Sequence, residues 1–175
     1  QQVYFSKTFG CVRFVYNKML AERKEIYEKY KDDKKELKKQ KLPTPAKYKF
    51  EFDWLKEVDS LALANAQIDL QTAYKNFFSD KKVGFPKFKS KHKDRDSYTT
   101  NCVNNNIRIE NKKIRLPKFG LVKVNMHRPI LENETIKSCT ISKTPSGKYY
   151  ISVLVEFEHE IQPINYIKDN VIGLD

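Results

Sequence analysis

The sequence predicts an α+β fold in which helices come first and antiparallel strands follow. Residues 4–31 and 60–79 carry apolar side chains at intervals of three and four, the periodicity of an amphipathic helix. From residue 83 onward the pattern changes, and apolar and polar residues alternate as they do in half-buried strands. We therefore expect a helical lobe at residues 1–79 and a small antiparallel β-barrel at residues 80–165.

The helical part is predicted to contain two long helices and a short piece between them. The first buries one stripe of side chains, namely Phe5, Phe9, Val12, Tyr16, Met19 or Leu20, Arg23, Ile26 or Tyr27, and Tyr30. The charged run at residues 31–42 either continues this helix or forms a solvated connection. A short helical or extended piece anchored by Trp54 follows, and Ser60 or Asp59 caps the second helix. This arrangement is a helical hairpin or a three-helix, helix-turn-helix-like unit.

Two hairpin-forming stretches make up the predicted β-rich part. Residues 107–126 alternate apolar and polar side chains, with Asn-Lys and Phe-Gly as turns. Residues 135–158 form a second hairpin around Thr-Pro-Ser-Gly. Alternation places Tyr149, Ile151, Val153, Val155 and Phe157 on one face. A linker then precedes a terminal strand that ends at Asp175.

Positive charge is concentrated in the middle third of the chain, which favours a polyanionic partner. Residues 80–128 hold 14 Lys and Arg against 4 Asp and Glu, a net charge of +10. The corresponding net charges are +5 for residues 1–79 and −3 for residues 129–175. Membrane headgroups are also polyanionic, but this segment is interrupted by Pro and Gly and is not an amphipathic helix. No apolar run reaches the roughly 20 residues that span a bilayer, so we expect a soluble, cytoplasmic protein.

The stretch "VGFPKFKSKHK", residues 83–93, combines alternating lysines with aromatic residues. In an extended segment Lys87, Lys89, Lys91 and Lys93 lie on one side, where they can neutralise phosphates. Phe85 and Phe88 can stack on unpaired bases, an interaction worth about 1–3 kcal/mol per base. A solvated basic loop whose two phenylalanines plug the core explains the same residues equally well.

Three other features are weaker on their own. Arg13, Asn17 and Arg23 lie near one stripe of the first helix with Tyr16 beside them, but an ordinary amphipathic helix is the simpler interpretation. The terminal "VIGLD" ends an apolar strand in a carboxylate, as in ribonuclease-H-like nucleases, although a surface Asp is the more common case. Cys11, Cys102 and Cys139 are isolated and lack CxxC spacing, so we interpret them as small apolar fillers.

Taken in order, six stretches of the sequence resemble the N-terminal half of TnpB proteins, also called OrfB and long described as transposases of insertion sequences. They are "KTFGCVRFVYNKML", "WLKEVDSLALANAQIDLQTAYKNFF", "GFPKFKSK", "IRLPKFGLVKV", "IKSCTISKTPSGKYYISVLVE" and "VIGLD". The resemblance implies part of an RNA-guided DNA endonuclease, with a helical recognition lobe, a wedge-like (OB-like) barrel, and the first strand of a RuvC-like domain at residues 166–175. The first strand of that barrel, which normally precedes the helices, is not found in this sequence.

The resemblance also implies partners and site residues. Guide RNA and double-stranded target DNA with a short flanking motif are the implied partners, in a prokaryotic, nucleoid-associated setting. Asp175 becomes the first catalytic carboxylate of a Mg²⁺-dependent nuclease, whose other ligands lie beyond this sequence. We therefore expect no cofactor and no cleavage for this chain alone. The implied nucleic-acid contacts are Lys7, Arg13, Tyr16, Asn17, Phe85, Lys87, Phe88, Lys89, Lys91, Lys93, Arg115 and Lys118.

Two functions of other classes fit the same sequence. A DNA-binding regulator with a helix-turn-helix-like unit would recognise a duplex without cutting it. Alternatively, the helices could serve mainly to dimerise the chain. The sequence leaves the oligomeric state, the bound RNA and the flanking motif open.

Overall fold

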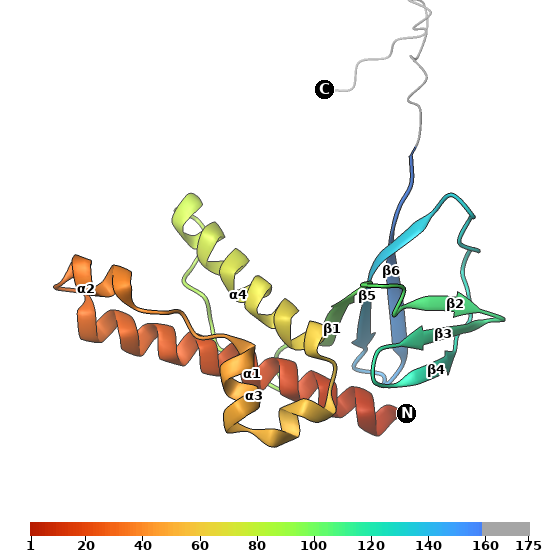
Figure 1. The fold of residues 1–175 in the computed structure, drawn as a ribbon, viewed down its shortest axis with the longest axis horizontal. Helices are drawn as coiled ribbons and strands as arrows, with labels where there is room; N and C mark the ends of the chain where they lie inside the picture. Colours follow the sequence, from red (N-terminus) through yellow and green to blue (C-terminus); the bar gives the residue numbers. More distant parts are fainter. Residues whose placement is uncertain (159–175) are drawn as a thin grey trace, which may run out of the picture.

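The computed structural model describes residues 1–158 and confirms an α+β fold with helices before strands. Figure 1 shows the helices at one end of the molecule and two small antiparallel sheets at the other. The predictions for residues 159–175, which include the linker, the terminal strand and Asp175, lie outside the described residues.

The first helix, α1 (Gln2–Tyr30), buries side chains along its first two-thirds only. Phe5, Phe9, Val12, Tyr16, Met19 and Leu20 of the predicted stripe are all buried. Beyond Leu20 the stripe is less covered: Arg23 and Ile26 are half-buried, and Tyr27 is 55% exposed. The prediction of one continuous buried stripe therefore holds only as far as Leu20.

Three short helical elements connect α1 to the second long helix. The charged run contains a separate helix, α2 (Lys34–Lys39), because the Asp33 carboxylate caps it by accepting hydrogen bonds from the backbone N–H groups of Lys35 and Glu36. Next come α3 (Pro45–Glu51) and the 3₁₀ helix η1 (Asp53–Glu57). Within η1 the fully buried side chain is Leu55, whereas the predicted anchor Trp54 is 38% exposed and packs on Phe14.

Helix α4 (Ser60–Ser79) begins and ends where the sequence predicts. Asp59 is its N-cap, and the Asp59 carboxylate accepts a hydrogen bond of 3.1 Å from the backbone N–H of Leu61. Ala62, Leu63, Ala66 and Leu70 form its buried stripe. The two long helices pack against each other, and α4 also contacts β1.

The strands form two sheets of three strands each in the described part of the chain. The first has the order β1 (Asp96–Asn101), β5 (Thr135–Lys143), β6 (Tyr149–Glu156); the second has the order β2 (Arg108–Glu110), β3 (Lys113–Leu116), β4 (Gly120–Lys123). All pairs are antiparallel. The predicted turns are present: Asn111 and Lys112 both have positive φ, as a two-residue hairpin turn requires, and Gly147 has φ +81° in the β5–β6 turn.

The two antiparallel sheets do not close into the predicted β-barrel within the described residues. No hydrogen-bonded ladder joins the first sheet to the second in residues 1–158. Instead, a groove of about 890 Å³ lies between them, lined by apolar side chains such as Ile114 and Val122 from one sheet and Ile151 and Val153 from the other. Alternation in the sequence identifies the inner face of each strand, but it does not specify which sheet edges pair.

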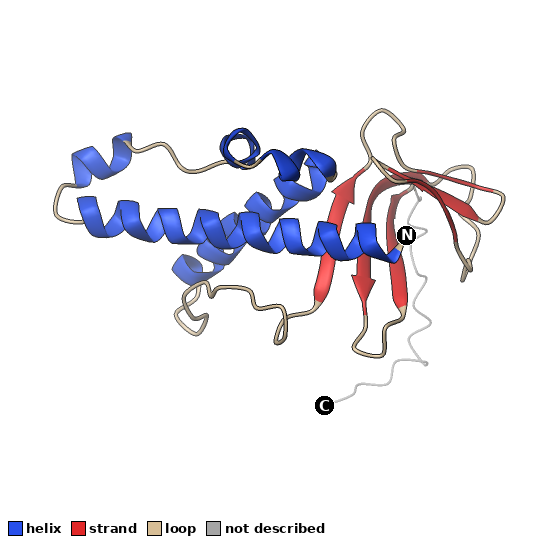
Figure 2. Cartoon of the chain, turned by 90° about the horizontal axis from the view of Figure 1, so that it is seen from below, coloured by secondary structure: helices blue, strands red, loops and turns tan. Residues whose placement is uncertain are grey.

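The core joins the helices to the first sheet. Met19 of α1, Leu63 of α4, Tyr98 of β1 and Ile141 of β5 belong to one continuous cluster of buried side chains. The rings of Phe9 and Tyr98 pack with centroids 5.7 Å apart, and Figure 2 shows β1 beside α1. Because β1 contacts both long helices, the segment that precedes it, residues 80–95, must run back along the helices.

Candidate nucleic-acid interface

The lysine-rich segment, residues 83–93, has no regular secondary structure. It returns from the far end of α4 toward β1 (Figure 1) and ends in a turn at residues 91–93. The alternating lysines therefore do not form part of a strand. Pro86 is buried, so the segment is held to the protein at its centre.

Asn17 fixes the segment to α1 through two hydrogen bonds. The Asn17 side-chain amide donates to the backbone carbonyl of Lys89 at 2.9 Å, and its carbonyl oxygen accepts from the backbone N–H of Lys89 at 2.8 Å. The side chain thus satisfies both backbone groups of one residue, as a neighbouring strand would. Asn17, predicted to contact nucleic acid, positions the segment in this structure.

The Lys89 side chain also turns back to the helices. Its ammonium lies 4.4 Å from the centroid of the Tyr16 ring and 3.5 Å from the Asp69 carboxylate. Tyr16 itself is buried; burial raises the pKa of its phenol, and the nearby Asp69 carboxylate raises it further. Lys89 therefore leaves the predicted row of lysines, and its charge is partly neutralised by Asp69.

Lys87, Lys91 and Lys93 point to solvent. None of the ion pairs found within residues 1–158 involves these three lysines. Their uncompensated charge lies on a segment that Asn17 and Pro86 hold in place. Charges in fixed positions can bind a phosphate backbone with less loss of chain entropy than charges on a mobile loop.

The two phenylalanines of the segment are partly exposed rather than buried plugs. Phe85 is 40% exposed and Phe88 51% exposed. The ammonium of Lys24 on α1 lies 5.1 Å from the centroid of the Phe85 ring and 4.8 Å from that of the Phe88 ring. These cation–π contacts use part of each ring to dock the segment, and the remaining surface is open to solvent.

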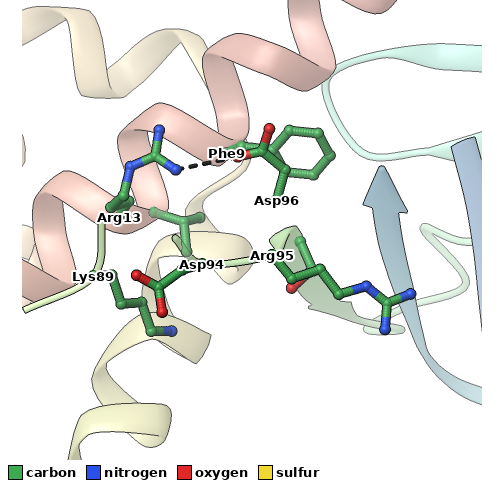
Figure 3. A pocket seen from close by; sticks show the side chains of 8 residues that line it. Phe9, Arg13, Lys89, Asp94, Arg95 and Asp96 are labelled. Carbon is green, nitrogen blue, oxygen red and sulfur yellow. Dashed lines mark hydrogen bonds and ion pairs between the residues drawn. The ribbon is translucent and has the colours of Figure 1, made fainter. Parts of the chain in front are cut away.

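Arg13 pairs with Asp96 at the start of β1, with 3.1 Å between the guanidinium and the carboxylate. The pair borders a small hollow of about 190 Å³ between α1 and residues 89–97, shown in Figure 3. Arg95 turns away from Arg13 and donates a hydrogen bond to the Ser142 hydroxyl at 2.9 Å. Because Asp94 and Asp96 balance most of the positive charge around it, the hollow is not a strong anion site.

The remaining predicted contacts do not join this segment. Lys7 forms an ion pair with Glu57. Arg115 on β3 and Lys118 in the following turn are exposed, but they belong to the second sheet, which lies apart from residues 83–93 in both Figure 1 and Figure 2. Sequence reasoning missed Lys113 and Lys123, which pair directly across β3 and β4 beside Arg115. Lys113, Arg115 and Lys123 thus form a second basic surface, and the alternation of basic and apolar residues in β3 was the signal that could have found it.

No cluster of three or more His, Cys, Asp or Glu side chains that could hold a metal ion occurs within residues 1–158. Likewise, none of the helices described here has the length and hydropathy needed to cross a bilayer. The three cysteines are free, and Cys11 and Cys139 are buried as expected of apolar fillers, whereas Cys102 is half-buried.

Burial should make two of the three thiols unreactive. It raises the pKa of the Cys11 thiol to about 11 and that of Cys139 to about 12, so both remain protonated at pH 8. We expect iodoacetamide at pH 8 to modify the half-buried Cys102 first and to modify Cys11 and Cys139 only after denaturation, as read by peptide mass spectrometry. Rapid alkylation of Cys11 or Cys139 in the native chain would show that burial does not protect these thiols.

Comparison with known proteins supports the resemblance in the sequence. Residues 1–32 match the family model of a helix-turn-helix domain of the OrfB_IS605 type. A candidate RNA-guided DNA endonuclease from Streptomyces pristinaespiralis is 32% identical over 159 residues, which are 89% of this chain and 38% of that protein. The candidate RNA-guided DNA endonuclease InsQ of Escherichia coli K12 is 31% identical over 176 residues, which cover all of this chain and 42% of InsQ. This chain belongs to the TnpB/OrfB family.

The TnpB/OrfB chain described here spans about two fifths of the length of these two relatives. It also matches the virulence protein VsdF of Salmonella dublin, with 39% identity over 53% of this chain and 84% of VsdF. The residues that match the helix-turn-helix model are covered by the single helix α1 in this structure.

Proposed function

We propose that this chain is the nucleic-acid-binding part of an RNA-guided DNA endonuclease and that it grips a guide RNA and the target DNA. The observation that carries the proposal is the lysine-rich segment, residues 83–93, in a chain of the TnpB/OrfB family. Asn17 holds this segment on α1, and its Lys87, Lys91 and Lys93 are exposed. In RNA-guided systems base pairing reads the sequence, while the protein holds the nucleic acid largely through its backbone. Fixed lysines that have no ion-pair partner within residues 1–158 suit that task.

The nuclease chemistry belongs, in this proposal, to the longer protein. Asp175 lies outside the described residues, and a single carboxylate cannot hold the pair of ions that two-metal phosphodiester cleavage needs. Mg²⁺ is proposed for the whole enzyme, where it would activate the attacking water and stabilise the leaving oxygen. The present chain is expected to bind nucleic acid without cutting it.

Binding of an RNA hairpin with a single-stranded tail tests the proposal. We expect the affinity to fall with salt, with a log–log slope of roughly 0.7–0.9 per phosphate contacted. Replacing Lys87 and Lys91 by Gln should reduce the slope by about 1.5 and weaken binding about 30-fold at 0.1 M salt. The measurement is fluorescence anisotropy of the labelled RNA at several salt concentrations.

A matched variant separates the position of charge from the amount of charge. Lys35 and Lys38 on α2 are exposed, and replacing both by Gln changes the net charge by the same amount. We expect this variant to bind RNA nearly as well as the unaltered chain. The proposal is wrong if the chain does not bind RNA or binds it independently of salt. It is also wrong if the two double variants lose RNA affinity equally.

A DNA-binding regulator is the second candidate, favoured by the helix-turn-helix match at residues 1–32. It would prefer duplex DNA to the RNA hairpin in the same anisotropy measurement. An order of affinity with RNA above duplex DNA supports the guide-binding function, and the reverse order supports the regulator.

A further inference from the structure

The last turn of α4 carries a phenylalanine, Phe78, that the core does not use. Phe78 is 77% exposed although it is a large apolar side chain. It lies near the far end of α4, which stands clear of the two sheets in Figure 1. An exposed aromatic residue by itself is ordinary, but Phe78 belongs to a group of aromatic rings that hold one another in place.

Neighbouring rings set the orientation of Phe78. Tyr74, one helical turn earlier, stacks with Phe78 at a centroid distance of 6.2 Å and an interplanar angle of 18°. Phe77 meets Phe78 edge-on at 5.1 Å, and Phe85 from the lysine-rich segment meets both Tyr74 and Phe77 at 5.5 and 5.3 Å. The four rings form a platform, and Phe78 is its most exposed member.

The platform belongs to a strongly basic stretch of the chain. Residues 74–93 contain seven lysines and one aspartate, a net charge of +6. Lys75, Lys81 and Lys82, the lysines nearest to Phe78 in the sequence, are all exposed. Covering Phe78 with an apolar protein surface would also desolvate these lysines, which is costly without acidic partners. A ligand that brings both an aromatic face and negative charge avoids this cost.

We propose that Phe78 stacks on an unpaired base of single-stranded nucleic acid, whose phosphates Lys75, Lys81 and Lys82 neutralise. The inference rests on the proposed function and names the form of nucleic acid bound at this end of α4. Bases inside a duplex are already stacked and offer no free face to Phe78, so the ligand is a single-stranded segment or an unpaired end. Aromatic side chains beside a basic track are the usual elements of such sites.

A short single-stranded RNA that carries 2-aminopurine tests the stacking, because the fluorescence of this base changes when it stacks. With the chain described here, Phe78→Leu should weaken RNA binding about tenfold and abolish the fluorescence change. The slope of log affinity against log salt should stay the same, because no phosphate contact is removed. Phe78→Tyr keeps an aromatic face and should retain both affinity and signal.

Phe50→Leu is the matched control, because Phe50 on α3 is 88% exposed and lies outside the platform. It should leave both measurements unchanged, and thermal unfolding should show that all three variants are folded. The stacking proposal is overturned if Phe78→Leu leaves the affinity and the signal intact. It is also overturned if Phe78→Leu weakens binding to blunt duplex RNA by the same factor as binding to the single strand.

These results also separate the inference from the function on which it rests. Salt-dependent RNA binding that depends on Lys87 and Lys91 but not on Phe78 retains the proposed function and removes the stacking site. Loss of RNA binding in the unaltered chain removes both.

Discussion

Replacing Asp59 by alanine is expected to lower the free energy of unfolding by about 2–4 kcal/mol, the largest effect that we expect for a single polar residue. Asp59 is 6% exposed and uses both carboxylate oxygens. One caps α4 at the backbone N–H of Leu61, and the other accepts a hydrogen bond from the Thr100 hydroxyl of β1. Alanine removes the cap and leaves the hydroxyl of Thr100, itself 1% exposed, without this acceptor.

Urea denaturation followed by circular dichroism measures this loss. Asp59→Asn should cost less, because asparagine is also a good N-cap and retains one oxygen acceptor. Asp32→Ala makes the same chemical change at an exposed position between α1 and α2 and should alter stability by less than about 0.5 kcal/mol. A similar stability for Asp59→Ala and Asp32→Ala would show that Asp59 does not connect the helices to the sheet.

Replacing Asn17 by alanine is expected to release the lysine-rich segment at a cost of about 2–3 kcal/mol. The variant loses both hydrogen bonds to the Lys89 backbone, and the Lys89 ammonium loses the geometry that places it over Tyr16. Because the released segment samples open conformations, trypsin should cut after Lys87, Lys89 and Lys91 about 30 to 150 times faster than in the unaltered chain.

Timed trypsin digestion read by mass spectrometry gives the cleavage rate at each lysine. Asn76→Ala is the control: it also replaces a helical asparagine by alanine, which raises helix propensity, but Asn76 is exposed on α4. Equal cleavage rates in Asn17→Ala and Asn76→Ala would mean that Asn17 does not hold the segment. RNA affinity should also fall in Asn17→Ala, since mobile lysines must be ordered on binding.

Elements with local signals were predictable from the sequence. The Asp59-Ser60 pair is a cap followed by an apolar period of three to four, and α4 begins there. The β5–β6 hairpin follows from alternation on both sides of a turn that needs the positive φ of Gly147. Both signals depend on residues that are close along the chain, so these two elements can be predicted without knowledge of the rest of the fold.

The candidate site was predictable in location but not in the roles of its residues. Composition identified residues 83–93 as the basic segment, and Lys87, Lys91 and Lys93 are exposed there. The sequence did not show that Lys89 is held by Asn17, because the two residues are 72 positions apart. The pairing of Arg13 with Asp96, 83 positions away, was hidden for the same reason.

The exposure of Phe78 was not predictable from the sequence. Tyr74, Phe77 and Phe78 are spaced i, i+3 and i+4, the pattern of one apolar helix face, so the spacing alone does not say which ring stays outside. Which ring remains outside depends on where α1 and the returning segment lie, and only the folded chain specifies that. The structure leaves Phe78 exposed and packs Phe85 against Tyr74 and Phe77.

The order of helices and strands, the inner faces of the strands, and the concentration of positive charge between residues 80 and 128 all follow from the sequence alone. These properties depend on backbone preferences and on side chains that are close along the chain. Only the fold of the described residues shows that the two sheets remain open toward each other and which lysines have no ion-pair partner there. Sheet-edge pairing and ion pairing join residues distant in sequence, so these outcomes depend on how α1, α4 and β1 pack together.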